Sequence, residues 1–141
     1  MTLNIDTIRE DFSVMDDWED RYRYLIDLGR ELEPFPEAAR DDAHKVNGCA
    51  SQVWVVADVA PGADPVIAFR GDPDAHIVRG LVAIMIALLS GRTASAVAAT
   101  DVEAVFRELG LDTHLSQQRA NGLRSMVRRM KSEAETARTP A

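Results

Sequence analysis

The sequence contains a single cysteine, Cys49, among its 141 residues. One thiol cannot form an internal disulfide, and it cannot supply the ligand set of a structural zinc site or an iron–sulfur cluster. We therefore expect no metal site in this chain. A free thiol is typical of proteins in reducing compartments, so we expect a cytoplasmic location.

Long hydrophobic runs are also absent. The longest covers residues 81–89, which is nine residues. A transmembrane helix needs about 20 predominantly apolar residues, so this run predicts a buried helix rather than a membrane span. The first residues lack a basic segment followed by an apolar core, so we expect no signal peptide.

Positive charge is scarce: 16 Lys and Arg residues stand against 23 Asp and Glu residues, for a net charge of −7. This balance argues against nucleic acid or an anionic membrane as the main partner. Residues 1–42 are the most acidic part, with thirteen acids and five arginines. They form either a solvated helix surface or a docking surface, and the composition favours neither.

The length of the chain predicts one domain with one hydrophobic core. We expect that domain to cover residues 1–135 and residues 136–141 to be a frayed tail. The apolar spacing predicts helices near residues 5–12 and 16–32, a brief strand at 44–46, strands at 52–59 and 66–69, and further helices to the C-terminus. This order predicts an α+β fold with a small antiparallel sheet covered by helices.

Several acidic residues precede helical patterns and are candidate N-caps. Asp6 and Asp16 lie at the starts of the first two helical patterns. Asp72 or Asp74 precedes the third, and a cap at Asp72 would place Pro73 at the first helical position, where its missing N–H costs nothing. From residue 81 onward this third helix is apolar all round, so we expect it to be the central buried helix.

Cys49 lies where a turn leads into the first long strand. Gly48 precedes it and allows a tight backbone, whereas Ser51 and Gln52 lead into a β-branched and aromatic run. Two interpretations are open at this point. Free cysteine is often an inert, buried small side chain. A thiol on a turn can instead be presented by rigid structure to a reaction partner.

The chemistry of a lone cysteine has few alternatives. A cysteine protease needs a histidine base within reach and a third group to orient it, and His44, five residues before Cys49, does not suggest such a pair. A dithiol oxidoreductase would have a second cysteine at position 52, which is glutamine. A sulfur carrier requires only one thiol.

Five cations and no acid lie between residues 117 and 131. Cations are favoured near the C-terminus of a helix, which accounts for Arg128, Arg129 and Lys131. Arg119 instead falls in the first turn after the predicted cap Ser116, where a cation is disfavoured. A role in binding is one explanation for its presence.

Four blocks of this sequence form a recognisable pattern. They are VNGCASQVW at residues 46–54, FRGDPD with IVRGL at 69–81, HLS with Arg119 and NGL at 114–123, and WEDRY through Leu28 and Gly29. Together they resemble the SufE family, the sulfur acceptors of iron–sulfur cluster assembly. The resemblance implies a SufE/IscU-like α+β sandwich. It covers both the SufE and the CsdE branches of the family.

The resemblance implies that Cys49 is the catalytic residue, which accepts sulfur as a persulfide from a SufS-type cysteine desulfurase. It also implies stimulation of that desulfurase and delivery of sulfur to a SufB-containing scaffold. Pyridoxal phosphate would belong to the desulfurase, so we expect no cofactor on this chain. The alternative is a non-catalytic module that only regulates a desulfurase. A homodimer is left open.

By the same resemblance, a small set of residues supports the cysteine loop or binds the partner. These are Gly48, Ser51, Gln52, Asp74, His114 and Arg119. The segment around Asp74 and the side chain of Arg119 are expected to lie near the cysteine.

Overall fold

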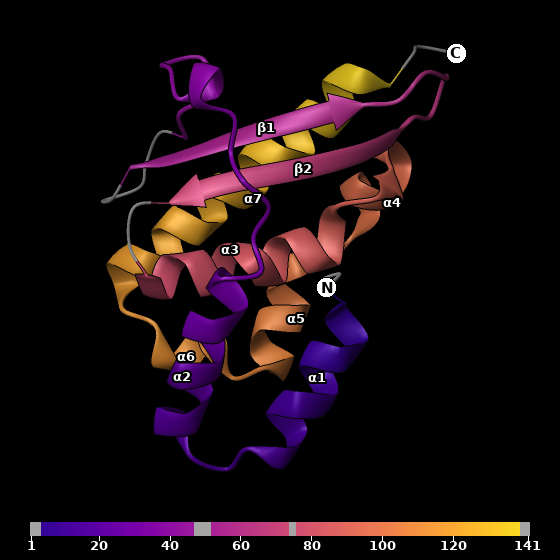
Figure 1. Ribbon diagram of the computed structural model, residues 1–141. Helices are drawn as coiled ribbons and strands as arrows, with labels where there is room; N and C mark the ends of the chain where they lie inside the picture. Colours follow the sequence, from indigo (N-terminus) through magenta and orange to yellow (C-terminus); the bar gives the residue numbers. More distant parts are fainter. Residues whose placement is uncertain (1–3, 47–51, 74–75, 139–141) are drawn as a thin grey trace.

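The computed structural model describes residues 4–46, 52–73 and 76–138. A three-stranded antiparallel sheet lies over a group of helices (Figure 1). The elements are α1 (Ile5–Val14), α2 (Trp18–Gly29), the 3-10 helix η1 (Glu37–Ala39), β1 (Val53–Val59), β2 (Val66–Pro73), α3 (His76–Leu89), β3 (Arg92–Thr93), α4 (Ala94–Ala99), α5 (Val102–Glu108), α6 (Leu111–His114) and α7 (Gln117–Ala137). The predicted α+β class is confirmed.

The sheet has the order β1-β2-β3, and its register pairs Val53 with Pro73 and Val59 with Ile67. β2 therefore continues four residues beyond the predicted end at residue 69. Asp72 lies inside this strand, so the prediction that it could cap the next helix is wrong. Pairing with β1 holds its backbone extended, and Pro73 ends the strand, where a missing N–H is tolerated.

Two predicted helix starts are also wrong by one or two residues. α1 is capped by Asn4, whose side chain accepts hydrogen bonds from the backbone N–H groups of Asp6 and Thr7. α2 is capped by Asp17 rather than Asp16, with its carboxylate accepting from the N–H of Glu19. In each case a neighbouring Asn or Asp provides an equivalent oxygen, and the backbone decides which one reaches the free N–H groups.

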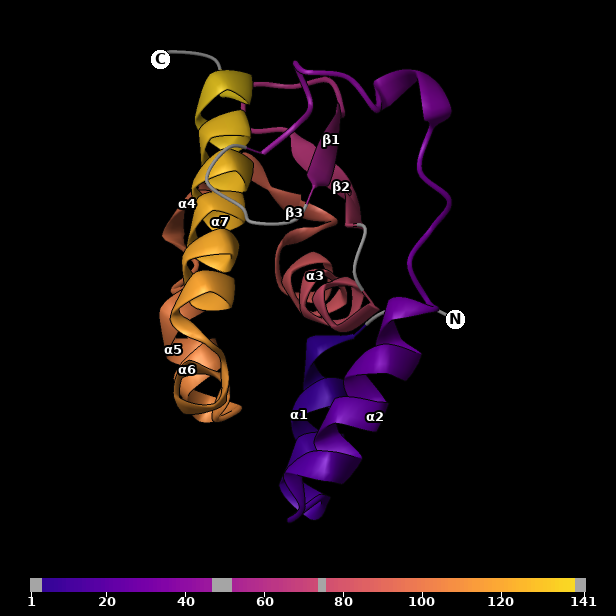
Figure 2. The same ribbon diagram turned by 90° about the vertical axis from the view of Figure 1, so that its left-hand side faces the viewer.

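α3 is the central buried helix, as predicted. Residues 81–85 are at most 1% exposed. Figure 2 shows α3 nearly end-on between the sheet on one side and α1 and α2 on the other, with α7 running alongside. Because α3 touches all of these layers, it has no face for polar side chains over this stretch.

Residues 111–114 form the short helix α6. The helix that follows differs from prediction. α7 continues to Ala137, so Arg128, Arg129 and Lys131 lie in mid-helix and the explanation by the helix C-terminus is wrong. Since residues 139–141 are outside the described part, the domain boundary at residue 135 stays a prediction. No helix in the described ranges is long and apolar enough to cross a membrane.

Candidate functional site

The chain that enters the cysteine segment is paired with the chain that leaves it. The N–H of Val46 donates to the carbonyl of Val53 at 2.8 Å, and the N–H of Val55 donates to the carbonyl of His44 at 2.9 Å. A β-bridge between Lys45 and Trp54 joins the same two stretches. The brief strand predicted at residues 44–46 is present as this bridge. Gly48, Cys49 and Ser51 themselves lie outside the described residues.

The second block of the family resemblance starts at Phe69 within β2 and reaches the same end of the sheet. Val53, the first residue of β1, pairs with Pro73, the last residue of β2. The first residue of β1 and the last residue of β2 therefore lie side by side. We call this place the sheet end and define it by residues 43–46, 52–54 and 72–73. Asp74 follows it directly and lies outside the described residues.

Asp72 links three elements at the sheet end. Its carboxylate is 15% exposed and lies 2.6 Å from Nε of Arg40 and 3.4 Å from an Nη of Arg79. The hydrogen bond to Asp72 raises the pKa of Arg40, so this guanidinium stays charged. Arg40 belongs to the segment before the cysteine and Arg79 to α3. The sequence pattern does not predict this group, because the residues only meet once β2 extends to Pro73.

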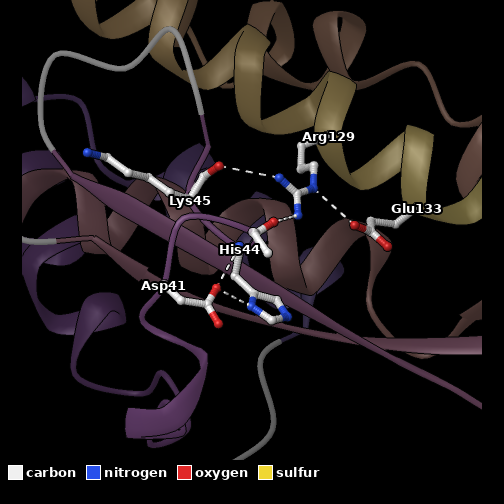
Figure 3. A network of polar contacts seen from close by, with 6 residues as sticks. Asp41, His44, Lys45, Arg129 and Glu133 are labelled. Carbon is white, nitrogen blue, oxygen red and sulfur yellow. Dashed lines mark hydrogen bonds and ion pairs between the residues drawn. The ribbon is translucent and has the colours of Figure 1, made fainter.

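Arg129 of α7 reaches the same segment from the other side. Its guanidinium donates to the backbone carbonyls of Ala43 and Lys45, the latter at 3.3 Å. Figure 3 shows the Arg129 side chain directed toward Lys45. Its Nε donates to Glu133 at 3.0 Å. The sequence pattern predicts Arg129 as a cation near the C-terminus of a helix. Nothing in that local pattern indicates partners more than eighty residues away.

Asp41 and His44 form a local contact just before the sheet end. Oδ1 of Asp41 lies 2.7 Å from Nδ1 of the His44 ring and accepts the backbone N–H of His44 at 3.0 Å (Figure 3). The side-chain hydrogen bond from His44 is the main cause that lowers the pKa of Asp41. The contact orders the turn that precedes the paired segment.

The carboxyl group of Asp41 is accordingly expected to titrate below its ordinary pKa in the folded protein. Since the folded pKa is the lower one, the contribution of this contact to stability is complete above the unfolded pKa and is lost as pH falls through the folded pKa. A carbon-13 NMR titration of Asp41 checks this, and His44→Ala should move the midpoint back upward. An identical midpoint in that variant would contradict the assigned cause.

His114 makes its described contacts with α2 and with its own helix. Its ring stacks on Trp18 with centroids 3.8 Å apart and an interplanar angle of 13°. Nδ1 lies 3.1 Å from the carbonyl of Gly110, and the His114 carbonyl accepts from the Tyr22 hydroxyl at 3.2 Å. Figures 1 and 2 both place α6 at the end of the molecule away from β1. Its role in supporting the cysteine loop stays a prediction.

Arg119 is the third residue of α7 and is exposed. Its backbone N–H donates to the hydroxyl of Ser116 at 3.2 Å, which confirms Ser116 as the cap. In the part of the chain that the structure describes, its guanidinium forms no ion pair. Gln52, at the start of β1, is exposed as well. Binding roles for both residues remain predictions.

Among the described residues, no group of three metal-ligating side chains comes together. The polar residues around the sheet end instead form ion pairs and hydrogen bonds that connect separate backbone segments. This arrangement positions a chain segment, and the reactive group would have to come from the cysteine that the segment carries.

Comparison with known proteins identifies a family for this chain. The family "SufE: Fe-S metabolism associated domain" matches residues 6–134. An uncharacterised SufE-like protein of Rhizobium meliloti is 55% identical over 139 residues, which are 98% of this chain and 99% of that protein. A second, from Rhizobium etli, is 52% identical over 133 residues, covering 94% and 90% of the two chains.

A solved structure supports the fold. The solution structure of a hypothetical protein from Thermus thermophilus superimposes with a TM-score of 0.76, covering 97% of this chain and 98% of that one, at 21% identity. At that identity the likeness concerns the fold alone. From the family match and the two relatives it follows that this chain belongs to the SufE family of Fe-S metabolism associated proteins.

Proposed function

We propose that this protein is a sulfur acceptor and carrier for iron–sulfur cluster assembly. Cys49 takes sulfur as a persulfide from a SufS-type cysteine desulfurase and passes it to a SufB-type scaffold in the cytoplasm. Binding of the carrier also stimulates the desulfurase, whose pyridoxal phosphate releases sulfur from L-cysteine. Membership of the SufE family, in a chain with one thiol, is the observation that carries this proposal.

The transfer step balances without an external oxidant. The thiolate of Cys49 attacks the terminal sulfur of the persulfide on the desulfurase. A new S–S bond forms at Cys49, the S–S bond on the donor breaks, and the donor cysteine leaves as a thiolate. In the delivery step a thiolate of the scaffold attacks the terminal sulfur on Cys49, and Cys49 leaves as the thiolate. Only one cysteine on the carrier is required.

The described structure suits a carrier because residues 40–46, which lead to Cys49, are bonded both to the sheet and to α7. β1 pairs with residues 44–46, Asp72 holds Arg40, and Arg129 holds the carbonyls of Ala43 and Lys45. A thiol attached to a supported segment is presented in a limited set of positions, which favours reaction in a docked complex.

Mass spectrometry of the intact protein tests the proposal. After incubation with a SufS-type desulfurase and L-cysteine, we expect a mass increase of one sulfur atom, located on the peptide that contains Cys49. Two oxygen atoms weigh nearly as much, but a sulfinic acid is not reversed by a thiol reductant, whereas a persulfide is. The added mass should therefore disappear with dithiothreitol.

A sample without desulfurase is the control and should stay unmodified. If Cys49 stays unmodified beside an active desulfurase that this protein still stimulates, the carrier function is wrong and the protein is a regulatory module of the desulfurase.

A further inference from the structure

We propose that Arg129 is a positioning residue for sulfur transfer: it binds the carbonyls of Ala43 and Lys45 and so holds the turn that ends at the bridge residue Lys45 in place beside β1. The proposal rests on the carrier function of Cys49. It concerns a residue that the sequence motifs do not include and that lies in the middle of α7.

The directions of three successive carbonyl groups support this role. The carbonyl of His44 points to β1, where it accepts the N–H of Val55 at 2.9 Å. The carbonyls on either side, those of Ala43 and Lys45, both accept from the guanidinium of Arg129. Residues 42–44 form a turn, and the N–H of Lys45 donates back to the carbonyl of Asp41 at 3.1 Å. One carbonyl of this segment is thus bonded to β1, and the carbonyls on either side of it are bonded to one arginine.

An arginine is suited to this position and a lysine is not. The guanidinium is planar and carries several N–H donors in a fixed fork, so two of its nitrogens can reach the two carbonyls of Ala43 and Lys45. Nε of Arg129 is bonded to Glu133 one turn further along α7, at 3.0 Å, which orients the fork (Figure 3). The side chain of Arg129 is 26% exposed, so this is a half-buried contact rather than a free surface ion pair.

The position of the Arg129 contact along the chain gives it a function. Val46, whose N–H pairs with Val53, is three residues before Cys49. A slip of residues 43–46 along β1 would move everything attached to them. Since group transfer depends on the distance and direction of attack, such a shift would slow transfer within the docked complex more than it would weaken docking.

Amide hydrogen exchange tests the structural half of the proposal. In Arg129→Ala we expect the amides of Val46 and Val55 to exchange about tenfold faster, since their pairing loses the support of charge-assisted hydrogen bonds. Amides of α3 should be unchanged. Arg129→Lys should restore only part of the protection. Arg128→Ala is the matched control, because Arg128 contacts Ser125 and is adjacent on the same helix. Unchanged exchange at Val46 in Arg129→Ala would overturn the proposal.

Steady-state kinetics with a SufS-type desulfurase tests the functional half. For Arg129→Ala we expect kcat of sulfur transfer to the carrier to fall about tenfold, while KM for the carrier stays within about twofold. Arg128→Ala should behave like the wild type in both constants. Faster exchange without a fall in kcat would overturn the positioning role and leave the carrier function intact. Absence of transfer to the wild-type protein would instead overturn the carrier function, independently of the exchange result.

Discussion

Replacement of Cys49 by serine is expected to abolish sulfur acceptance and stimulation of the desulfurase while leaving the fold intact. A serine hydroxyl is not ionised near neutral pH, and attack on a persulfide requires a thiolate. No second thiol exists in the chain to replace it. The side chain changes by one atom, so the loss of unfolding free energy should stay below about 2 kcal/mol.

The measurements are persulfide formation by mass, sulfide release by the desulfurase, and unfolding in urea. Arg128→Ala, which leaves the thiol in place, is the control for handling and concentration. A loss of stability well above about 2 kcal/mol would assign Cys49 to the core instead. Retained stimulation by Cys49→Ser would support the alternative in which the protein only regulates its partner.

Replacement of Gly80 by alanine is expected to destabilise the protein by roughly 3 kcal/mol or more, the upper range for overpacking. A Cβ atom at Gly80 would lie 2.0 Å from the carbonyl oxygen of Leu25 and 2.5 Å from its carbonyl carbon. These are backbone atoms of α2 and cannot rotate away. Leu25 is fully buried, so α2 would have to move as a whole.

A second glycine, on α2, lies at the same crossing of α2 and α3. A Cβ at Gly29 of α2 would lie 2.7 Å from Cβ of Arg79 on α3. The backbones of α2 and α3 therefore approach closely at both glycines. In an exposed helix, Gly→Ala normally stabilises by about 1 kcal/mol through helix propensity, so the expected change at Gly80 has the opposite sign.

Urea unfolding of Gly80→Ala measures this effect, and Gly71→Ala is the matched control. A Cβ at Gly71 would meet Cγ1 of Val82 at 2.7 Å, which is a clash with one side-chain methyl group and not with the backbone of a helix. We expect a smaller loss for that variant. Equal stability of Gly80→Ala and the wild type would show that α2 can be displaced at no cost.

Much of the fold follows from local signals in the sequence. The all-round apolar run predicts α3 as the central helix, the proline- and glycine-rich loop after residue 59 predicts the antiparallel pair β1 and β2, and Ser116 marks the start of α7. These predictions hold because hydrophobic periodicity, turn residues and caps act over a few residues. Family membership, and with it the interest in Cys49, is also carried by short contiguous blocks.

The tertiary structure alone decides how the sheet end is held together. The local sequence predicts Asp72 as a possible helix cap. In the structure, pairing with β1 extends β2 through Pro73, and Asp72 contacts Arg40, which is 32 residues away in sequence. The local sequence predicts Arg129 as a cation near a helix end. In the structure, α7 continues to Ala137, and Arg129 bonds the carbonyls of Ala43 and Lys45.

The physical reason is the same in both cases. A cap or an apolar stripe is specified by neighbours in the chain, whereas an arginine can bond any carboxylate or carbonyl that the fold brings within its reach. Which one it meets depends on strand register and helix length, and these are set by packing of the whole core. The sequence thus determined that a single thiol stands before β1, and the packing of α7 and β2 decided which side chains hold the backbone that leads to it.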